Sequence, residues 1–145
     1  YHGVSVPVYI EPDKDLEIFL KIENWEMEVR FAGTGAPKNE YLNNRVLREF
    51  YPDYKTDEAG FVQSLKAWEM KLSGILDSMH FESFFVDKEK KRIHYQVYAY
   101  LPNYPSYQKY QLQKQGNEAS GEFYALLSQS IPEEEELMEL DLDFQ

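Results

Sequence analysis

The chain contains no cysteine, and this absence narrows its chemistry more than any other feature of its composition. Without thiols it can form no disulfide, no thiolate metal site, no cysteine nucleophile and no C-x-x-C redox pair. Thiol chemistry is therefore excluded within this chain, although cysteine-free domains occur in every compartment.

Long apolar runs are also missing. No run approaches the roughly 20 residues that span a bilayer. Because Tyr1 is not an initiator Met, we expect that a preceding segment has been removed, together with any signal peptide or lipid anchor. A membrane is therefore an expected partner only through such a lost anchor.

Basic residues are too few for a nucleic-acid protein. There are 15 Lys and Arg against 26 Asp and Glu, a net charge of −11. Nucleic-acid binding depends largely on Lys and Arg that displace counterions from phosphates. Nucleic acid is therefore not an expected partner.

The acidic excess is concentrated in residues 133–145, which hold seven acidic residues and no basic one, against 19 acidic and 15 basic residues elsewhere. A calcium loop would need a central glycine, which this segment lacks. Two interpretations remain: a linker toward a following domain, which we favour because charge runs are weak signals, or an edge strand that pairs with a partner. The strand would use its alternating apolar residues Met138, Leu140, Leu142 and Phe144.

Residues 1–132 are predicted to form a single α+β domain, with a β part over 1–33 and a helical part over 36–130. Three short antiparallel strands are expected within residues 4–31. The first covers 4–10, with Pro7 indicating an edge strand or a bulge. The second covers 16–22, and the third, 25–31, alternates apolar and polar residues without exception.

Helical periodicity follows, and it predicts a three- to four-helix bundle. A helix from Pro37 to Phe50 is expected to end at Tyr51-Pro52. A clearer one runs from 62 to 79, with Asp57 as its cap. A third covers 81–100 and ends at Leu101–Pro105, a loop covers 106–120, and a short helix around Phe123–Leu127 precedes Pro132.

The catalytic and cofactor motifs that we considered do not appear. Gly33 and Gly35 lie at a strand-to-helix junction, but neither a phosphate loop nor a dinucleotide fingerprint is present, so a tight turn is the better interpretation. His2, His80 and His94 lack the spacing of metal ligands, and no G-x-S-x-G elbow occurs. We expect no catalytic residue, no metal and no cofactor.

Tyrosines are a second candidate for a partner surface, after the acidic segment, because aromatic residues make up 16% of the chain. The tyrosines between 95 and 110 could line a glycan or peptide groove, although their helical spacing also fits core packing with hydrated hydroxyl groups. Tyr104, Tyr107 and Tyr110, together with Leu140, Leu142 and Phe144, are therefore candidates for a partner surface.

Three ordered patterns resemble a known family. Phe31-x-Gly33-x-Gly35-Ala36-x-Lys38-Asn39-x-Tyr41-Leu42 resembles the F-x-G-x-G-A-x-x-N-x-Y-L segment upstream of the catalytic domain in exported thioredoxin-like (TlpA/ResA-like) thiol-disulfide oxidoreductases. Residues 10–18 are similar to the strand pair before it, although Asp13-Lys14 replaces the usual Gly-Asp. Residues 85–105 are similar to the helical insert after it, and the similarity covers most of residues 8–145.

The resemblance implies a non-catalytic N-terminal accessory domain in the periplasm or cell envelope. Its implied partners are a thioredoxin-like domain in cis, with the C-x-x-C beyond Gln145, and a protein partner. Gly33, Gly35, Asn39 and Tyr41 match the family pattern as structural junction residues. The alternatives are a free-standing envelope module that binds glycan or peptide through its tyrosines, and an enzyme with an unfamiliar carboxylate pocket.

Overall fold

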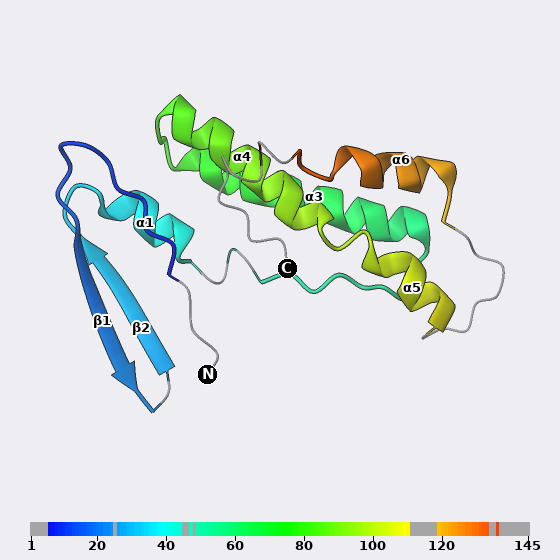
Figure 1. The fold of residues 1–145 in the computed structure, drawn as a ribbon, viewed down its shortest axis with the longest axis horizontal. Helices are drawn as coiled ribbons and strands as arrows, with labels where there is room; N and C mark the ends of the chain where they lie inside the picture. Colours follow the sequence, from blue (N-terminus) through cyan, green and yellow to red (C-terminus); the bar gives the residue numbers. More distant parts are fainter. Residues whose placement is uncertain are drawn as a thin grey trace. The chain divides into compact units, whose positions relative to one another are not determined.

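The structure is a computed structural model that describes residues 6–24, 26–44, 47, 49–110, 119–133 and 136 of the 145-residue chain. The chain divides into two compact units, Tyr1–Glu49 and Phe50–Gln145. The first holds a β-hairpin and a short helix, and the second is helical (Figure 1). The predicted α+β class is confirmed.

The sheet is one antiparallel hairpin of β1 (Glu17–Glu23) and β2 (Glu26–Ala32). Its register places Ile18 opposite Phe31 and Leu20 opposite Val29. The last two predicted strands are therefore confirmed as neighbours, and their alternation puts apolar residues on one face and mostly polar residues on the other.

The first predicted strand is wrong in the residues that the structure describes, because 6–10 have no strand conformation. Side chains take the place of a neighbouring strand there. Asn39 bonds both backbone polar groups of Tyr9, and the Asn43 amide donates to the Pro7 carbonyl at 2.9 Å. Pro7 itself has no N–H for a ladder. The described sheet therefore has two strands instead of three.

Helix α1 (Ala36–Leu42) starts with a proline in its first turn, as predicted, but it ends eight residues before Phe50. Its C-cap Asn43 returns to the Pro7 segment. The helix packs against β2, so it belongs to the same unit as the strands and not to the helical part. The division between the two compact units, at 49–50, therefore lies beyond the change from strand to helix at residues 33–36, and the single domain over 1–132 stays a prediction.

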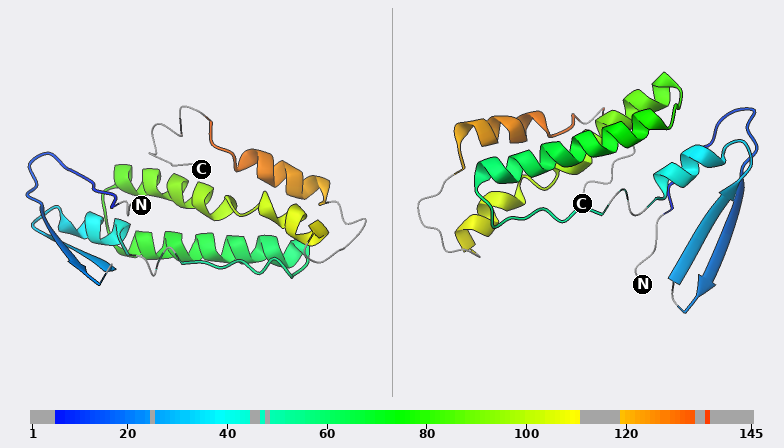
Figure 2. Two further views of the ribbon diagram at one scale, coloured as in Figure 1. Left: turned by 60° about the horizontal axis from the view of Figure 1, so that its bottom comes forward. Right: turned by 180° about the vertical axis from the view of Figure 1, so that it is seen from behind.

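In the second unit, α3 (Glu58–Ser78) and α4 (Ser83–Tyr98) lie side by side (Figure 2). The predicted cap of α3 is confirmed, because the Asp57 carboxylate accepts a hydrogen bond from the Gly60 N–H at 2.8 Å. Helix α6 (Gly121–Gln129) confirms the predicted helix before Pro132.

The predicted loop over 106–120 is wrong for its first part, because helix α5 spans Asn103–Tyr110. Pro105 falls in the first turn of that helix, where a missing N–H costs no hydrogen bond. The proline that indicated a helix end therefore lies at a helix start. Residues 111–118 lie outside the described part of the chain.

Aromatic stacking forms the core of the second unit. Phe61 stacks on Tyr104 with ring centroids 4.5 Å apart, and Tyr104 lies 5.6 Å from Phe123. Phe50, predicted to lie on a helix, instead stacks on Trp68 at 4.2 Å. In the described residues no helix combines the length and the apolar character that a membrane crossing requires.

Candidate functional site

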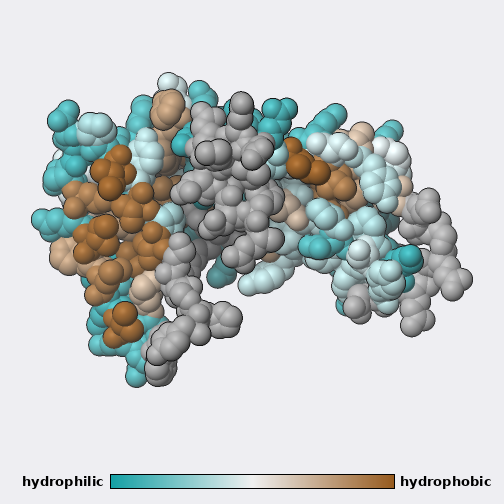
Figure 3. All heavy atoms as spheres, in the orientation of Figure 1, coloured by the Kyte–Doolittle hydropathy of each residue, from teal (hydrophilic) through white to brown (hydrophobic). Residues whose placement is uncertain are grey.

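One face of the hairpin carries only apolar side chains, and much of it is open to solvent. On β1, Ile18, Leu20 and Ile22 are 44%, 62% and 72% exposed. Their partners on β2 are Phe31, Val29 and Met27. Figure 3 shows hydrophobic side chains gathered over these two strands.

Leaving such an apolar face in water is energetically unfavourable for so small a sheet. Isolated two-stranded hairpins are marginally stable in water, and most need a third strand or a packed face. Full burial of an Ile or Leu side chain contributes about 1.5–3 kcal/mol. Ile18, Leu20 and Ile22 leave about half or more of their apolar surface in water. This face, here called the apolar face, is therefore the strongest candidate for an interaction surface.

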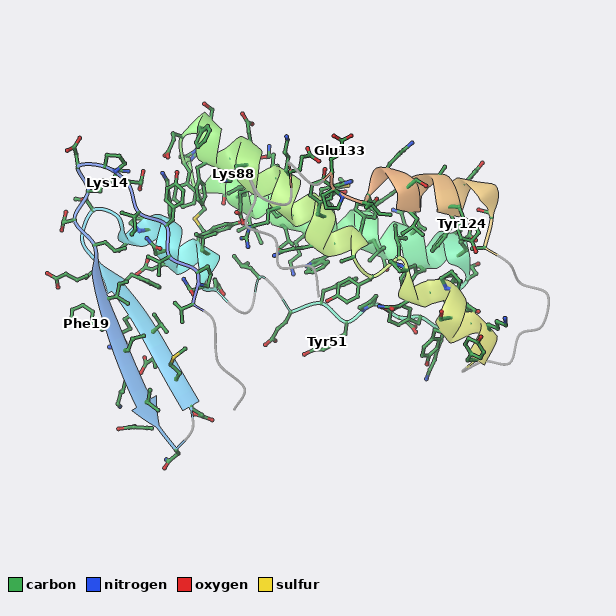
Figure 4. All side chains as sticks on the ribbon, viewed as in Figure 1. Lys14, Phe19, Tyr51, Lys88, Tyr124 and Glu133 are labelled. Carbon is green, nitrogen blue, oxygen red and sulfur yellow. The ribbon has the colours of Figure 1, made fainter. Side chains whose placement is uncertain are left out.

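The opposite face of the hairpin is charged except for Phe19 and Ala32. Lys21 pairs with Glu23 at 3.0 Å, and Arg30 pairs with Glu28 at 2.8 Å. Phe19 stands among these charges with 53% of its surface exposed. Its ring projects beyond β1 on the side away from β2 (Figure 4). A hollow in this region is lined by residues of both strands, among them Phe19, Lys21 and Arg30.

Gly33 and Gly35 hold the end of β2 against the segment that precedes β1. Gly33 has φ +95°, a conformation that favours glycine, and a Cβ there would lie 2.5 Å from the Asp15 carbonyl oxygen. The Gly35 N–H donates to that same oxygen at 2.9 Å. The Asp15 carboxylate also accepts from the Thr34 hydroxyl at 2.6 Å, and this bond lowers the pKa of Asp15.

Asn39 holds the chain upstream of this turn. Its side chain is fully buried, accepts from the Tyr9 N–H at 2.7 Å and donates to the Tyr9 carbonyl at 2.9 Å. It also donates to the Gly35 carbonyl at 2.9 Å. One amide therefore imitates a strand neighbour for Tyr9 and ties it to the glycine turn.

A buried ion pair completes this junction. Lys38 is 3% exposed, and its Nζ lies 2.5 Å from Glu11 Oε1. Burial raises the pKa of Glu11, but hydrogen bonds from Lys38 and Lys14 outweigh it and leave the pKa below its ordinary value. Lys38 also lies over the Tyr9 ring, 5.0 Å from its centroid.

The structure therefore brings Gly33, Gly35 and Asn39 together, as junction residues around the segment that precedes β1. Tyr41, the fourth predicted junction residue, is 8% exposed on α1. Sequence reasoning missed Asp15, although an acidic residue before a strand that meets a Gly-Thr-Gly turn is a recognisable pattern for side-chain-to-backbone bonding.

The predicted tyrosine surface is only partly a surface. Tyr104 is 5% exposed, stacks between Phe61 and Phe123, and donates its hydroxyl to the Thr56 carbonyl at 3.0 Å, so its assignment to a partner surface is wrong. Tyr107 stacks on Tyr54 at 5.3 Å. Tyr110 is 70% exposed. Leu140, Leu142 and Phe144 lie outside the described residues.

A polar cluster links α3 to α4. Glu69 bonds His94 Nδ1 at 2.8 Å and accepts from the Tyr98 hydroxyl at 3.0 Å. Burial, followed by the nearby Glu69 charge, raises the pKa of Tyr98. Both bonds of Glu69 run from α3 to α4, so interhelical bonding is the role that this geometry supports.

Within the described ranges, no group of three His, Asp or Glu side chains could hold a metal ion. One carboxylate there, Glu89, is buried, and Arg92 donates to it at 2.8 Å. A single paired carboxylate does not make the pocket of several carboxylates that the enzyme hypothesis needs.

Comparison with known proteins gives no independent identification: no family model, no curated protein and no solved structure matches this chain. Function therefore has to be inferred from the hairpin and its junction.

Proposed function

We propose that this chain is a non-catalytic accessory module of an exported thioredoxin-like thiol-disulfide oxidoreductase of the periplasm or cell envelope. In this proposal it positions the redox domain of the same polypeptide or shapes the surface that meets the partner of that domain. The observation that carries the proposal is the exposed apolar face of the hairpin, with Leu20 62% and Ile22 72% accessible.

The motif resemblance supports the choice of parent. The residues that match the family pattern are those that fix the hairpin: Gly33 and Asn39 bond or abut the segment 9–15 that leads into β1. A junction of this kind holds two strands in a fixed orientation, and an apolar strand face held in this way suits a neighbouring domain better than a small polar ligand.

The alternative, a module that binds glycan or peptide through its tyrosines, has less support from the structure than from the sequence. Its surface depended on several tyrosines acting together, and Tyr104 is a core residue. Tyr110 alone offers little more than a single exposed ring. We therefore propose no second function.

The test uses the complete gene product. Its sequence should contain a C-x-x-C pair after Gln145, and a product without that pair would overturn the proposed parent. A photo-crosslinking residue in place of Ile22, on the apolar face, should then capture the redox domain of the same molecule, as read by peptide mass spectrometry. The same residue in place of Lys66, exposed on α3, is the control. Capture from both positions alike would contradict docking on the apolar face.

A further inference from the structure

The outer edge of β1 is a second open feature, separate from the apolar face. Among the residues that the structure describes, β1 pairs with β2 alone, and all seven of its residues are exposed. An open edge strand offers unpaired backbone groups to another strand, and proteins protect such edges with proline, bulges or charges. Strand β1, with the sequence EIFLKIE, contains no proline, and its three charged residues, Glu17, Lys21 and Glu23, include both signs, so they can pair with a second strand as well as repel it.

We propose that two copies of the chain associate through this edge, with their β1 strands antiparallel and Phe19 of one copy opposite Phe19 of the other. The two hairpins would then form one four-stranded sheet. This proposal goes beyond the accessory role, because it concerns the strand edge and a second copy, whereas the accessory role concerns the apolar face and a domain of the same polypeptide.

Residues 17–21, five of the seven in β1, are self-complementary in that register. A two-fold axis at Phe19 places Glu17 opposite Lys21 and Ile18 opposite Leu20, and the symmetry repeats each pair. Opposite charges, aromatic pairs and branched aliphatic pairs are the cross-strand neighbours that stabilise antiparallel sheets. Both sets of side chains also stay on their own faces, so the apolar face continues across the two copies.

Neighbouring registers lose this complementarity. An axis at Leu20 places Glu17 opposite Glu23 and Lys21 opposite Phe19, so like charges meet and the aromatic pair is lost. A shift by a single residue along one strand would place apolar side chains opposite charged ones, because side chains alternate between faces with a period of two. Phe19 therefore marks the axis that the charges favour.

The position of Phe19 fits this role. Its ring projects beyond the outer edge of β1, as Figure 4 shows, and 53% of its surface is exposed. Lys21 and Glu23 are also accessible, with side chains 61% and 69% exposed, so Lys21 can exchange its partner within the strand for Glu17 of a second copy. One strand edge makes a small interface, so the association should be weak, with a dissociation constant on the order of micromolar or weaker.

The test is sedimentation equilibrium of the chain over a concentration series, with circular dichroism to confirm that each variant is folded. The unchanged chain should move from monomer toward dimer. Lys21→Glu places a carboxylate opposite Glu17 twice per dimer and should weaken association about tenfold. Glu17→Lys should do the same. The double variant Glu17→Lys/Lys21→Glu restores both pairs and should recover the association.

Glu26→Lys is the matched control, because it makes the same change of charge on the same face but on β2. It should leave the association unchanged. A chain that stays monomeric at every concentration would overturn the proposal, and so would a folded double variant that does not recover. Neither result bears on crosslinking from Ile22, so failure here and failure of the accessory role can be told apart.

Discussion

The side-chain amide of Asn39 bonds both the N–H and the carbonyl of Tyr9, at 2.7 and 2.9 Å, from a fully buried position. We expect Asn39→Ala to lower the free energy of unfolding by about 2–3 kcal/mol, because three partners lose their hydrogen bonds in a buried site. Hydrogen exchange at the Tyr9 amide gives a local readout, and its protection should be lost. Glu40→Ala, exposed on the same helix, is the control and should leave that protection intact.

A second pair of variants separates backbone conformation from packing space. Gly33→Ala forces an L side chain into φ +95° and places its Cβ 2.5 Å from the backbone oxygen of Asp15. We expect a loss of about 1–3 kcal/mol in denaturant unfolding. Gly74→Ala, in mid-α3 with nothing within 4 Å, should instead stabilise by about 0.5–1 kcal/mol. Equal effects of the two substitutions would contradict the strained turn at Gly33.

Tyr104 and Tyr110 share one helix, but their replacement should change stability by very different amounts. Tyr104→Ala removes a ring that stacks on Phe61 and lies near Phe123, so a loss of about 3–5 kcal/mol in unfolding free energy is expected. Tyr110→Ala removes a side chain that is 70% exposed and should change stability by less than about 0.5 kcal/mol. Thermal unfolding followed by circular dichroism would show the difference, and two similar melting temperatures would speak against a buried Tyr104.

The sequence predicted those elements whose periodicity comes from one apolar face. Helix α3 shows the reason: its apolar residues recur at helical spacing, and Asp57 caps its first turn. Strand β2 was equally clear, because Met27, Val29 and Phe31 alternate with charged residues. Local pattern and final structure agree at both places.

The errors arose where distant residues decide local structure. Residues 6–10 are apolar and β-branched enough for a strand, yet Asn39 and Asn43 from α1 occupy their backbone groups. A proline is compatible with a helix end and with a helix start, so Pro105 alone could not distinguish them. In the structure it lies in the first turn of α5, next to the buried Tyr104. For the site, the pattern indicated Gly33 and Asn39. The Asp15 carboxylate could have been found from its place before a strand that meets a Gly-Thr-Gly turn, but the contact of its carbonyl with that turn forms only after the chain folds back.

The last prediction concerns alkaline pH. A hydrogen bond to the Glu136 carboxylate, with burial as the second cause, raises the pKa of Tyr95 from 10.0 to about 12. Because the folded state holds this proton more tightly than the unfolded state, the stabilisation is complete below pH 10 and disappears as the pH rises from 10 toward 12. Tyr98, whose pKa is raised by burial and by Glu69, adds to the same loss.

Tyr95→Phe should therefore flatten the fall in stability over this range, measured as denaturant unfolding at a series of pH values. Glu136→Gln should shift the tyrosinate absorbance titration toward lower pH, because it removes the acceptor charge that opposes ionisation of Tyr95. Tyr124→Phe, at a half-exposed tyrosine on α6, is the control and should leave the alkaline slope unchanged. A Tyr95→Phe variant with the unaltered slope would show that the bond to Glu136 does not persist in solution, and that this acidic residue does not anchor the chain to α4.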